Sequence, residues 1–181
     1  MPSTDGPDYP SIIQVYMQRC QKLSEPQYLL QFRRYSEKVL DDPLDGLNWK
    51  ELLNWEHRHL LYTRCELPEP RAEMPIDIIK QARGRCREFA LLYHGLLSAN
   101  KYACRIIIDC STLQDKSKVS AGDHVWNEIL LKRGWSHVDP TERIIRRPLM
   151  YAQQWNKDVN LVYAVTAREM LDVTQSYKVQ A

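Results

Sequence analysis

Residues 86–108 read CREFALLYHGLLSANKYACRIII, and the change of periodicity within this stretch indicates the fold. From residue 86 to residue 100 the apolar side chains recur every three or four positions, which is typical of a helix that buries one face. The β-branched run at 106–108 is instead typical of a largely buried strand. A helix with Cys86 in its first turn is therefore expected to lead into a sheet.

The residues that follow predict further strands of the same sheet. We expect strands at 124–131 and 135–139, joined by a short connection that contains Gly134, and another at 161–165. Short glycine-containing connections are typical of antiparallel neighbours. The sheet is therefore expected to be antiparallel.

Helices predominate before residue 86. Asn48 with Glu51 resembles a helix-capping pair, as does Ser24 with Gln27. Residues 65–75 contain three prolines and are expected to form an irregular connection. The expected helices are 11–23, 24–40 and one that begins near Asn48 and buries Trp49, Leu52, Leu53, Leu60 and Leu61.

Helices followed by consecutive strands predict an α+β fold in which helices pack on an antiparallel sheet. A chain of 181 residues is long enough for one core of ordinary size, so we expect a single domain over 1–181. Residues 1–10 contain three prolines and are expected to form a loose arm.

The composition is that of a globular protein without a strong overall charge. There are 25 basic and 23 acidic side chains, so no broad field would hold a nucleic acid or a membrane surface. The chain shows no signal peptide or membrane span, and we expect a cytoplasmic protein. The five cysteines lack paired spacing, which predicts free thiols, no structural zinc and no cofactor.

Cys86 differs from the other four cysteines in its surroundings. A helix start favours a thiolate, because the backbone dipole is positive there and amide hydrogens are unpaired. Gly84 permits a tight entry into the helix, and Arg83, Arg85 and Arg87 add positive charge. The alternative is a buried cysteine that acts as a small apolar side chain.

A thiolate nucleophile needs an imidazole, and the imidazole needs a group that orients it. His124 is the best candidate imidazole, since alternation along its strand places His124, Trp126 and Glu128 on one mixed face. Asp139 ends the next strand and is the candidate orienting group. The alternative for His124 is an ordinary core histidine.

The register of the two strands stays open in the sequence. A three-residue loop that pairs Leu131 with Trp135 sets His124 opposite Glu142. A tighter loop that pairs Leu130 with Arg133 sets His124 opposite Asp139, and a β-bulge is a further possibility.

Three segments resemble the catalytic blocks of the transglutaminase-like superfamily, in the family's order of Cys, His and Asp. They are GRCREFA at 84–90, DHVWNE at 123–128 and WSHVDPTE at 135–142. Further segments are similar to the peptide:N-glycanase branch of that superfamily: RPLMY at 147–151 with Trp155, VYAV at 162–165 and DVTQSY at 172–177.

The resemblance implies a papain-like core and a cysteine-dependent amide hydrolase that cleaves the bond between asparagine and N-acetylglucosamine. It implies Cys86 as nucleophile, His124 as acid and base, and Asp139 as its orienting group. Glycoproteins or peptides are the implied substrates, and protein partners stay unknown. The implied substrate-binding residues are Trp126, Glu128, Trp135, Glu142 and Trp155, with the alternative that the tryptophans belong to the core.

Two departures from the glycanase pattern bear on the substrate. The family has glycine and tryptophan where this chain has Arg87 and Phe89, and Arg87 could crowd or recharge the cleft. The superfamily's indole donor for the oxyanion could correspond to Trp55 or Trp49. The remaining hypotheses are a transglutaminase-like protein amidase, protease or transglutaminase, and an inactive sugar- or peptide-binding module.

Overall fold

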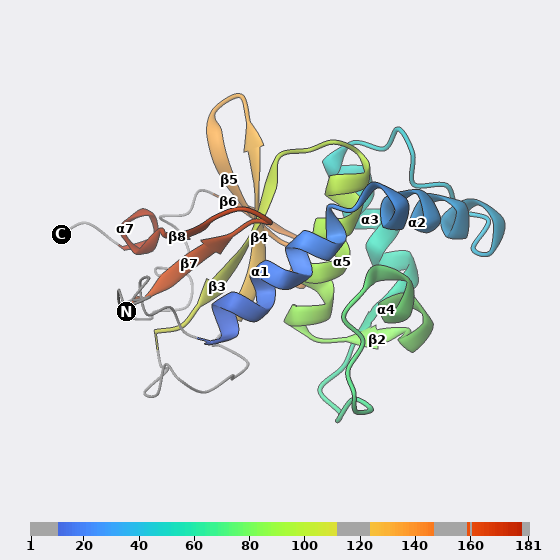
Figure 1. Cartoon of the computed structure of the whole chain (residues 1–181), viewed down its shortest axis with the longest axis horizontal. Helices are drawn as coiled ribbons and strands as arrows, with labels where there is room; N and C mark the ends of the chain where they lie inside the picture. The colour runs from blue at the N-terminus through green and yellow to red at the C-terminus, as the bar shows by residue number, and fades with distance from the viewer. Residues whose placement is uncertain (1–10, 112–123, 147–158, 160, 179–181) are drawn as a thin grey trace, which may run out of the picture.

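The computed structural model describes residues 11–111, 124–146, 159 and 161–178. The described chain forms a helical part and a sheet, with α5 between the two (Figure 1). Its helices are α1 (Ser11–Leu23), α2 (Pro26–Lys38), α3 (Trp49–His59), α4 (Pro75–Gln81), α5 (Cys86–Ala99) and α7 (Thr174–Tyr177). Its strands are β1 (Leu61–Tyr62), β2 (Arg83–Gly84), β3 (Cys104–Asp109), β4 (His124–Leu131), β5 (Gly134–Asp139), β6 (Ile144–Arg146), β7 (Val162–Val165) and β8 (Met170–Asp172).

The main sheet has six strands in the order β6-β5-β4-β3-β7-β8, and every neighbouring pair is antiparallel. This arrangement confirms the predicted α+β fold with helices on an antiparallel sheet. Strands β1 and β2 form a separate parallel pair, with Tyr62 beside Gly84. That small pair leads the chain directly into the start of α5.

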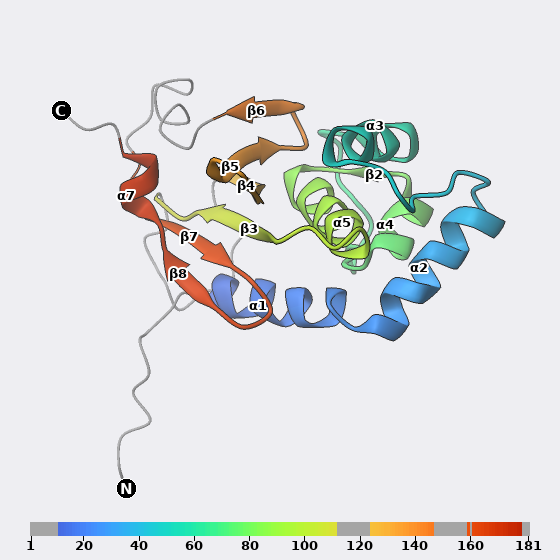
Figure 2. The same cartoon turned by 90° about the horizontal axis from the view of Figure 1, so that it is seen from above.

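Helices α1 and α5 cover one face of the sheet (Figure 2). Ile106 and Ile108 of β3 and Val125 and Ile129 of β4 point into the core on this face. The amide of Asn127 also points there, and its Nδ2 donates a hydrogen bond of 3.0 Å to the carbonyl of Ala90 in α5. This bond provides a partner for a buried polar group and fixes α5 against β4.

The opposite face of the sheet carries a smaller cluster around Trp126. Ile107, Trp126 and Val162 are fully buried there against Tyr177 of α7. The predicted alternation along β4 is thereby confirmed, because Val125 and Trp126 enter different cores.

The starts of two helices show how capping sets helix boundaries. The Asn48 side chain accepts from the backbone of Lys50 and Glu51, which confirms the predicted capping box of α3. The predicted start of α2 at Ser24 was wrong. The Ser24 hydroxyl instead donates to the carbonyl of Gln21, and α2 begins at Pro26, whose fixed φ suits the first helical position.

Several short elements lie outside the sequence prediction. Helix α3 ends at His59, so Leu61 lies in β1 and is 66% exposed, not in the core as predicted. Helix α4 was not predicted, although Pro75 at its start is a helix-start signal and Ala82 ends it in the left-handed conformation. Strands β6 and β8 and helix α7 are too short to show a period in the sequence.

Strands β4 and β5 pair in neither of the two registers considered above. Leu131 pairs with Gly134, so the turn consists of Lys132 and Arg133, and Gly134 follows it with a φ of 103° that suits glycine. Extending the pairing beyond Asn127–Val138 by one residue sets Asp139 opposite Trp126. His124 is therefore a diagonal neighbour of Asp139 on the same face of the sheet.

Candidate active site

Cys86 is the first residue of α5 and is half-buried. The carbonyl of Arg85 accepts the amide hydrogen of Phe89 at 3.1 Å, so the helix begins at this point. Amide hydrogens in the first turn of a helix have no acceptor within the helix, and the helix dipole is positive there. Both effects stabilise negative charge at the start of α5.

Gly84 allows the chain to turn tightly into this helix. A Cβ atom at position 84 would lie 2.5 Å from the Cβ of Glu88, which is far below contact distance. Glu88 is fully buried and accepts the amide hydrogen of Arg85 at 2.9 Å. Glycine is therefore required here for close packing.

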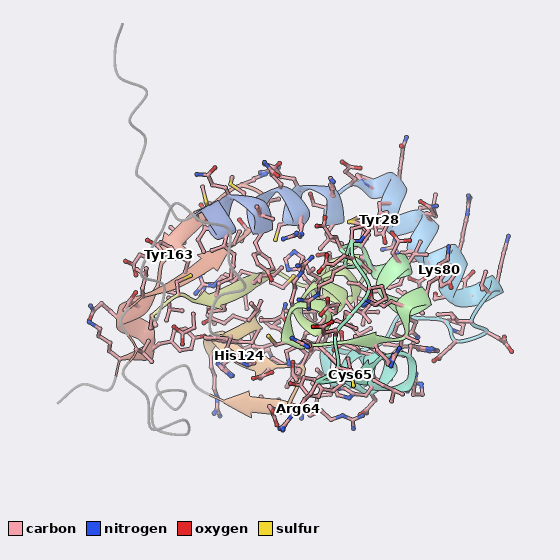
Figure 3. All side chains as sticks on the ribbon, turned by 90° about the horizontal axis from the view of Figure 1, so that it is seen from below. Tyr28, Arg64, Cys65, Lys80, His124 and Tyr163 are labelled. Carbon is pink, nitrogen blue, oxygen red and sulfur yellow. The ribbon has the colours of Figure 1, made fainter. Side chains whose placement is uncertain are left out.

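His124 begins β4, where the sheet meets the helical part of the molecule (Figure 3). Its Nε2 lies 2.6 Å from Oδ2 of Asp139. The other carboxylate oxygen, Oδ1, accepts the amide hydrogens of Thr141 at 3.1 Å and Glu142 at 3.4 Å. Asp139 is thus fixed by the turn that follows β5, and it holds the imidazole in one orientation.

The pKa of His124 is raised to about 10. Burial alone would lower it, but the hydrogen bonds to Asp139 and Cys86 and their negative charges outweigh that effect. Cys86 and Asp139 therefore both act on the same imidazole. A protonated His124 is the form that pairs with a thiolate and can donate a proton to a departing amine.

Two neighbours of Asp139 on α3 escaped the sequence analysis. Glu56 is fully buried, and burial followed by the charge of Asp139 raises its pKa well above the ordinary value. Nε2 of His57 lies 2.6 Å from the carbonyl oxygen of Pro140, and its ring packs against Phe89 at 5.1 Å between centroids. The signal in the sequence was a charged residue, Glu56, between apolar positions of a helical pattern.

Neither a metal cluster nor a membrane-spanning helix is found in the part of the chain that the structure describes. No three His, Cys, Asp or Glu side chains of the described residues are grouped so as to hold a metal ion. None of the described helices combines the length and the apolar character needed to cross a bilayer.

The family model for the transglutaminase-like superfamily matches residues 34–140, which include Cys86, His124 and Asp139. The match covers more than half of the chain. The chain belongs to the transglutaminase-like superfamily.

Curated relatives within this superfamily carry the name peptide-N(4)-(N-acetyl-beta-glucosaminyl)asparagine amidase. The protein of that name from Caenorhabditis briggsae is 34% identical over 114 residues, which are 62% of this chain and 17% of the relative. The Arabidopsis thaliana protein is 33% identical over 60% of this chain and 14% of the relative. This chain therefore spans less than a fifth of the length of either relative.

Solved structures of Rad4 complexes share the fold. A structure from a study of β-hairpin motifs in DNA duplex opening by the Rad4/XPC nucleotide excision repair complex matches with a TM-score of 0.61 at 12% identity. That match covers 94% of this chain and 48% of the other. Rad4-Rad23 crosslinked to undamaged DNA matches with a TM-score of 0.59 at 14% identity, over 91% and 46% of the two chains.

Trp126 and Glu128 do not form an open substrate cleft in this transglutaminase-like domain. Both side chains are fully buried, so the predicted direct contact with substrate was wrong. Nε1 of Trp126 donates to the hydroxyl of Tyr177 at 3.1 Å, and that hydroxyl in turn donates to Glu128. Nη2 of Arg105 lies 2.6 Å from the Glu128 carboxylate and completes this buried network.

Trp126 contacts the imidazole of His124 from the buried side of the site. Its ring stacks on the imidazole of His124, with centroids 5.4 Å apart and planes 25° from parallel. The alternative that this tryptophan belongs to the core is therefore correct, since α7 and the sheet enclose it.

The remaining predicted substrate residues are Trp135, Glu142 and Trp155. Trp135 pairs with Leu130, six residues and roughly 20 Å along β4 from His124, and the guanidinium of Arg105 lies 4.0 Å from its ring centroid. Contact between Trp135 and a substrate at Cys86 is therefore not supported. Glu142 is exposed beside Asp139 and stays a prediction. Trp155 lies outside the described residues.

The proposed indole donor is not Trp55. Its Nε1 donates to the carbonyl of Asp42 at 2.8 Å, and the side chain is fully buried. Trp49 is partly buried beneath the ammonium group of Lys50, and its assignment stays a prediction.

Arg87 and Phe89, the two departures from the glycanase pattern, have different surroundings in the structure. Nη2 of Arg87 lies 3.6 Å from a carboxylate oxygen of Glu73, which partly neutralises it. Phe89 is fully buried and packs in the core. The charge of Arg87 is therefore directed toward Glu73, on the side where α1 and Arg19 lie.

Proposed function

We propose that this chain is a cysteine-dependent amide hydrolase that cleaves the amide between an asparagine side chain and N-acetylglucosamine. The observation that carries the proposal is the arrangement of Cys86, His124 and Asp139, in which one imidazole bonds to both the thiol and a buried carboxylate. The names of the curated relatives support the choice of substrate bond.

The reaction begins when the sulfur of Cys86 attacks the carbonyl carbon of the substituted asparagine. As the tetrahedral adduct collapses, the carbon–nitrogen bond breaks, and His124 donates its proton to the departing glycosylamine. A thioester then joins Cys86 to the peptide's side chain. Water, deprotonated by His124, attacks this thioester, which breaks the carbon–sulfur bond and leaves aspartate in the peptide.

Asp139 acts through His124. It holds the imidazole in the tautomer and orientation that the two proton transfers need, as in other nucleophile–base–carboxylate sites. Its own position is set by the amides of Thr141 and Glu142.

The expected substrate is a denatured glycoprotein or a glycopeptide, because the amide must reach a half-buried thiol at a helix start. A cytoplasmic location suits a reactive thiol, since thiols stay reduced there. All five cysteines are free in the structure.

The decisive experiment incubates a denatured N-glycopeptide with the protein in oxygen-18 water. Mass spectrometry should detect free glycan and a peptide in which asparagine has become aspartate with one heavy oxygen. Cys86→Ala should give neither product. Cys65→Ala, which changes an exposed thiol, is the matched control and should retain both products.

The products also separate the alternatives. Deamidated glutamine or a cut peptide bond, with the glycan left in place, would replace the glycanase proposal by a protein amidase or protease. Glycopeptide binding without any product would instead identify an inactive binding module.

A further inference from the structure

A recess of about 310 Å³ opens beside the first turn of α5. It is lined by Glu66, Leu67, Glu69, Arg71 and Arg85. The first four belong to the connection between β1 and α4, and Arg85 directly precedes Cys86. The recess therefore adjoins the residue that precedes the proposed nucleophile.

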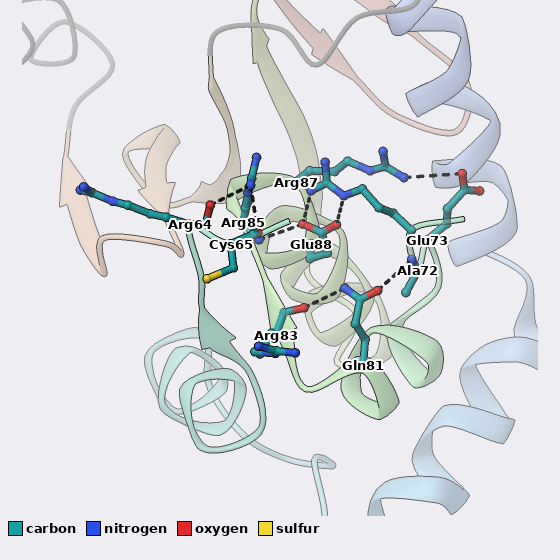
Figure 4. A network of polar contacts seen from close by, with 10 residues as sticks. Arg64, Cys65, Ala72, Glu73, Gln81, Arg83, Arg85, Arg87 and Glu88 are labelled. Carbon is teal, nitrogen blue, oxygen red and sulfur yellow. Dashed lines mark hydrogen bonds and ion pairs between the residues drawn. The ribbon is translucent and has the colours of Figure 1, made fainter. Parts of the chain in front are cut away.

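The floor of the recess is fixed by a bidentate ion pair. Nε and Nη2 of Arg71 each lie 2.7 Å from one carboxylate oxygen of Glu88, which has no exposed surface. Figure 4 shows Glu88 at the centre of this network, beside Arg85 and Arg87. A fork-to-fork pair of this kind restrains both side chains in one geometry.

Arg85 ties the same connection to α5 at a second point. Its Nη2 donates to the carbonyls of Arg64 at 2.9 Å and Cys65 at 3.0 Å (Figure 4). Arg71 and Arg85 are therefore held in place before any ligand arrives, which lowers the entropy cost of ordering them on binding.

The exposed side chains of the lining suit a polar ligand whose hydroxyl groups donate hydrogen bonds. Arg71 is already paired with Glu88, so Arg85 is the remaining cationic group of the lining beside Glu66 and Glu69. Glu66 and Glu69 are exposed and can accept hydrogen bonds, while the guanidinium hydrogens can donate them. Leu67 adds an apolar contact for the face of a sugar ring.

The recess lies within electrostatic range of the nucleophile. The pKa of Arg71 is raised first by its hydrogen bond to Glu88, and the charges of Glu88 and Cys86 raise it further. The first sugar of a glycosylated asparagine is bonded to the nitrogen of the scissile amide. A sugar site next to Cys86 is therefore where that reaction requires one.

We propose that the recess formed by residues 66–71 and Arg85 binds the hydroxyl groups of the leaving glycan through Glu66 and Glu69. This assignment rests on the proposed function and specifies which part of the substrate the recess would hold. It gives the irregular connection between β1 and α4 a direct role in recognition.

The test is a titration of the full chain with N,N′-diacetylchitobiose, followed by NMR of backbone amides. Glu66→Gln and Glu69→Gln keep the shape of each side chain but remove its charge. Each is expected to weaken binding by about tenfold, because hydrogen bonds to charged groups are the stronger kind. Glu37→Gln, on the exposed surface of α2, is the matched control and should bind like the unmodified protein.

Shifts confined to amides of residues 64–71 and 84–87, together with the two weakened affinities, would support the assignment. Equal chitobiose binding by all four proteins, or no binding at all, would overturn it. Preferential binding of a lysine-rich peptide would overturn it as well. Glycan release from a denatured glycopeptide is measured in parallel and tests the proposed function separately, since an enzyme can release glycan without using this recess.

Discussion

Nε2 of His124 lies 2.6 Å from Oδ2 of Asp139, although the two residues are diagonal neighbours on adjacent strands. The contact closes because the turn after β5 orients the carboxylate through the amides of Thr141 and Glu142. The imidazole of His124 supplies the reach, since diagonal neighbours on adjacent strands can be contacted by aromatic and other long side chains.

Asp139→Asn should lower kcat by on the order of 10³-fold while KM changes little. The amide can present its hydrogens to the imidazole and so select the wrong tautomer, whereas contacts to the substrate remain. Steady-state kinetics on a fluorescent glycopeptide provide the measurement. Asp45→Asn, at a partly exposed ion pair with Arg33, is the control that should leave both constants unchanged.

The pKa of His124, raised to about 10, gives a stability that depends on pH. A raised histidine pKa stabilises the fold fully below the unfolded value of about 6.5, and this contribution is lost as pH rises through about 10. The free energy of unfolding of the unmodified protein should therefore exceed that of Asp139→Asn by about 3 kcal/mol at pH 6. The difference should shrink steadily toward pH 10 in urea titrations.

A difference that stays constant between pH 6 and pH 10 would mean that His124 is not held in its protonated form. NMR titration of the five histidines can locate the effect. His94 serves as an internal reference, because burial lowers its pKa to about 4.

The sequence predicted well those elements in which an apolar repeat extends over many residues. The helix at Cys86 and the strand 124–131 each show an apolar repeat over at least eight residues, and both appear at the expected bounds. Their buried faces dictate that repeat, so sequence alone suffices. The positions of Cys86 and His124 at the starts of these elements followed from the same repeat.

The parts that sequence did not predict depend on contacts between distant segments. The family resemblance implied that Trp126 contacts sugar, but α7, only four residues long, covers this side chain. Arg105 and Glu128 form their pair across two strands, which no local pattern reveals. The register of β4 and β5 depended on which residues occupy a two-residue turn.

Iodoacetamide should modify Cys86 much faster than the buried cysteines near neutral pH. Burial raises the pKa of Cys104 to about 12 and the pKa of Cys20 further still, so their thiolate fractions are negligible. Peptide mapping after short exposures measures each rate. Cys65 is exposed and provides the rate of an ordinary accessible thiol. Equal rates at Cys65 and Cys86 would contradict an activated nucleophile.

Glu56→Gln should stabilise the protein above about pH 5. Burial raises the pKa of Glu56 in the folded state, so the unfolded chain loses this proton more readily. Stability is therefore lost as pH rises above the unfolded value of about 4.3, and glutamine removes that dependence. Urea unfolding at pH 4 and pH 8 should show no gain at the lower pH and a gain of about 1–3 kcal/mol at the higher. Glu37→Gln on the surface of α2 should show no gain at either pH.

Replacing Arg71 should reduce the reactivity of Cys86 as well as the stability of the fold. Arg71→Met removes the guanidinium from the fully buried Glu88 and leaves the carboxylate its hydrogen bond from the amide of Arg85, and breaking such a pair costs about 3 kcal/mol. Because Glu88 also packs against Gly84, its release should loosen the turn that presents Cys86. The rate of Cys86 alkylation and kcat, both measured well below the melting temperature, should fall by about tenfold.

Arg71→Lys keeps the positive charge but cannot form the two parallel hydrogen bonds to Glu88, so it should restore stability in part and kcat to a smaller extent. Arg34→Met, on the exposed face of α2, is the control and should leave the melting temperature unchanged. If Arg71→Met lowers the melting temperature but neither kcat nor the alkylation rate, the ion pair stabilises the fold without positioning the nucleophile. The double variant Arg71→Met, Glu88→Gln distinguishes the two, since paired residues that act as one unit should lose little more together than either does alone.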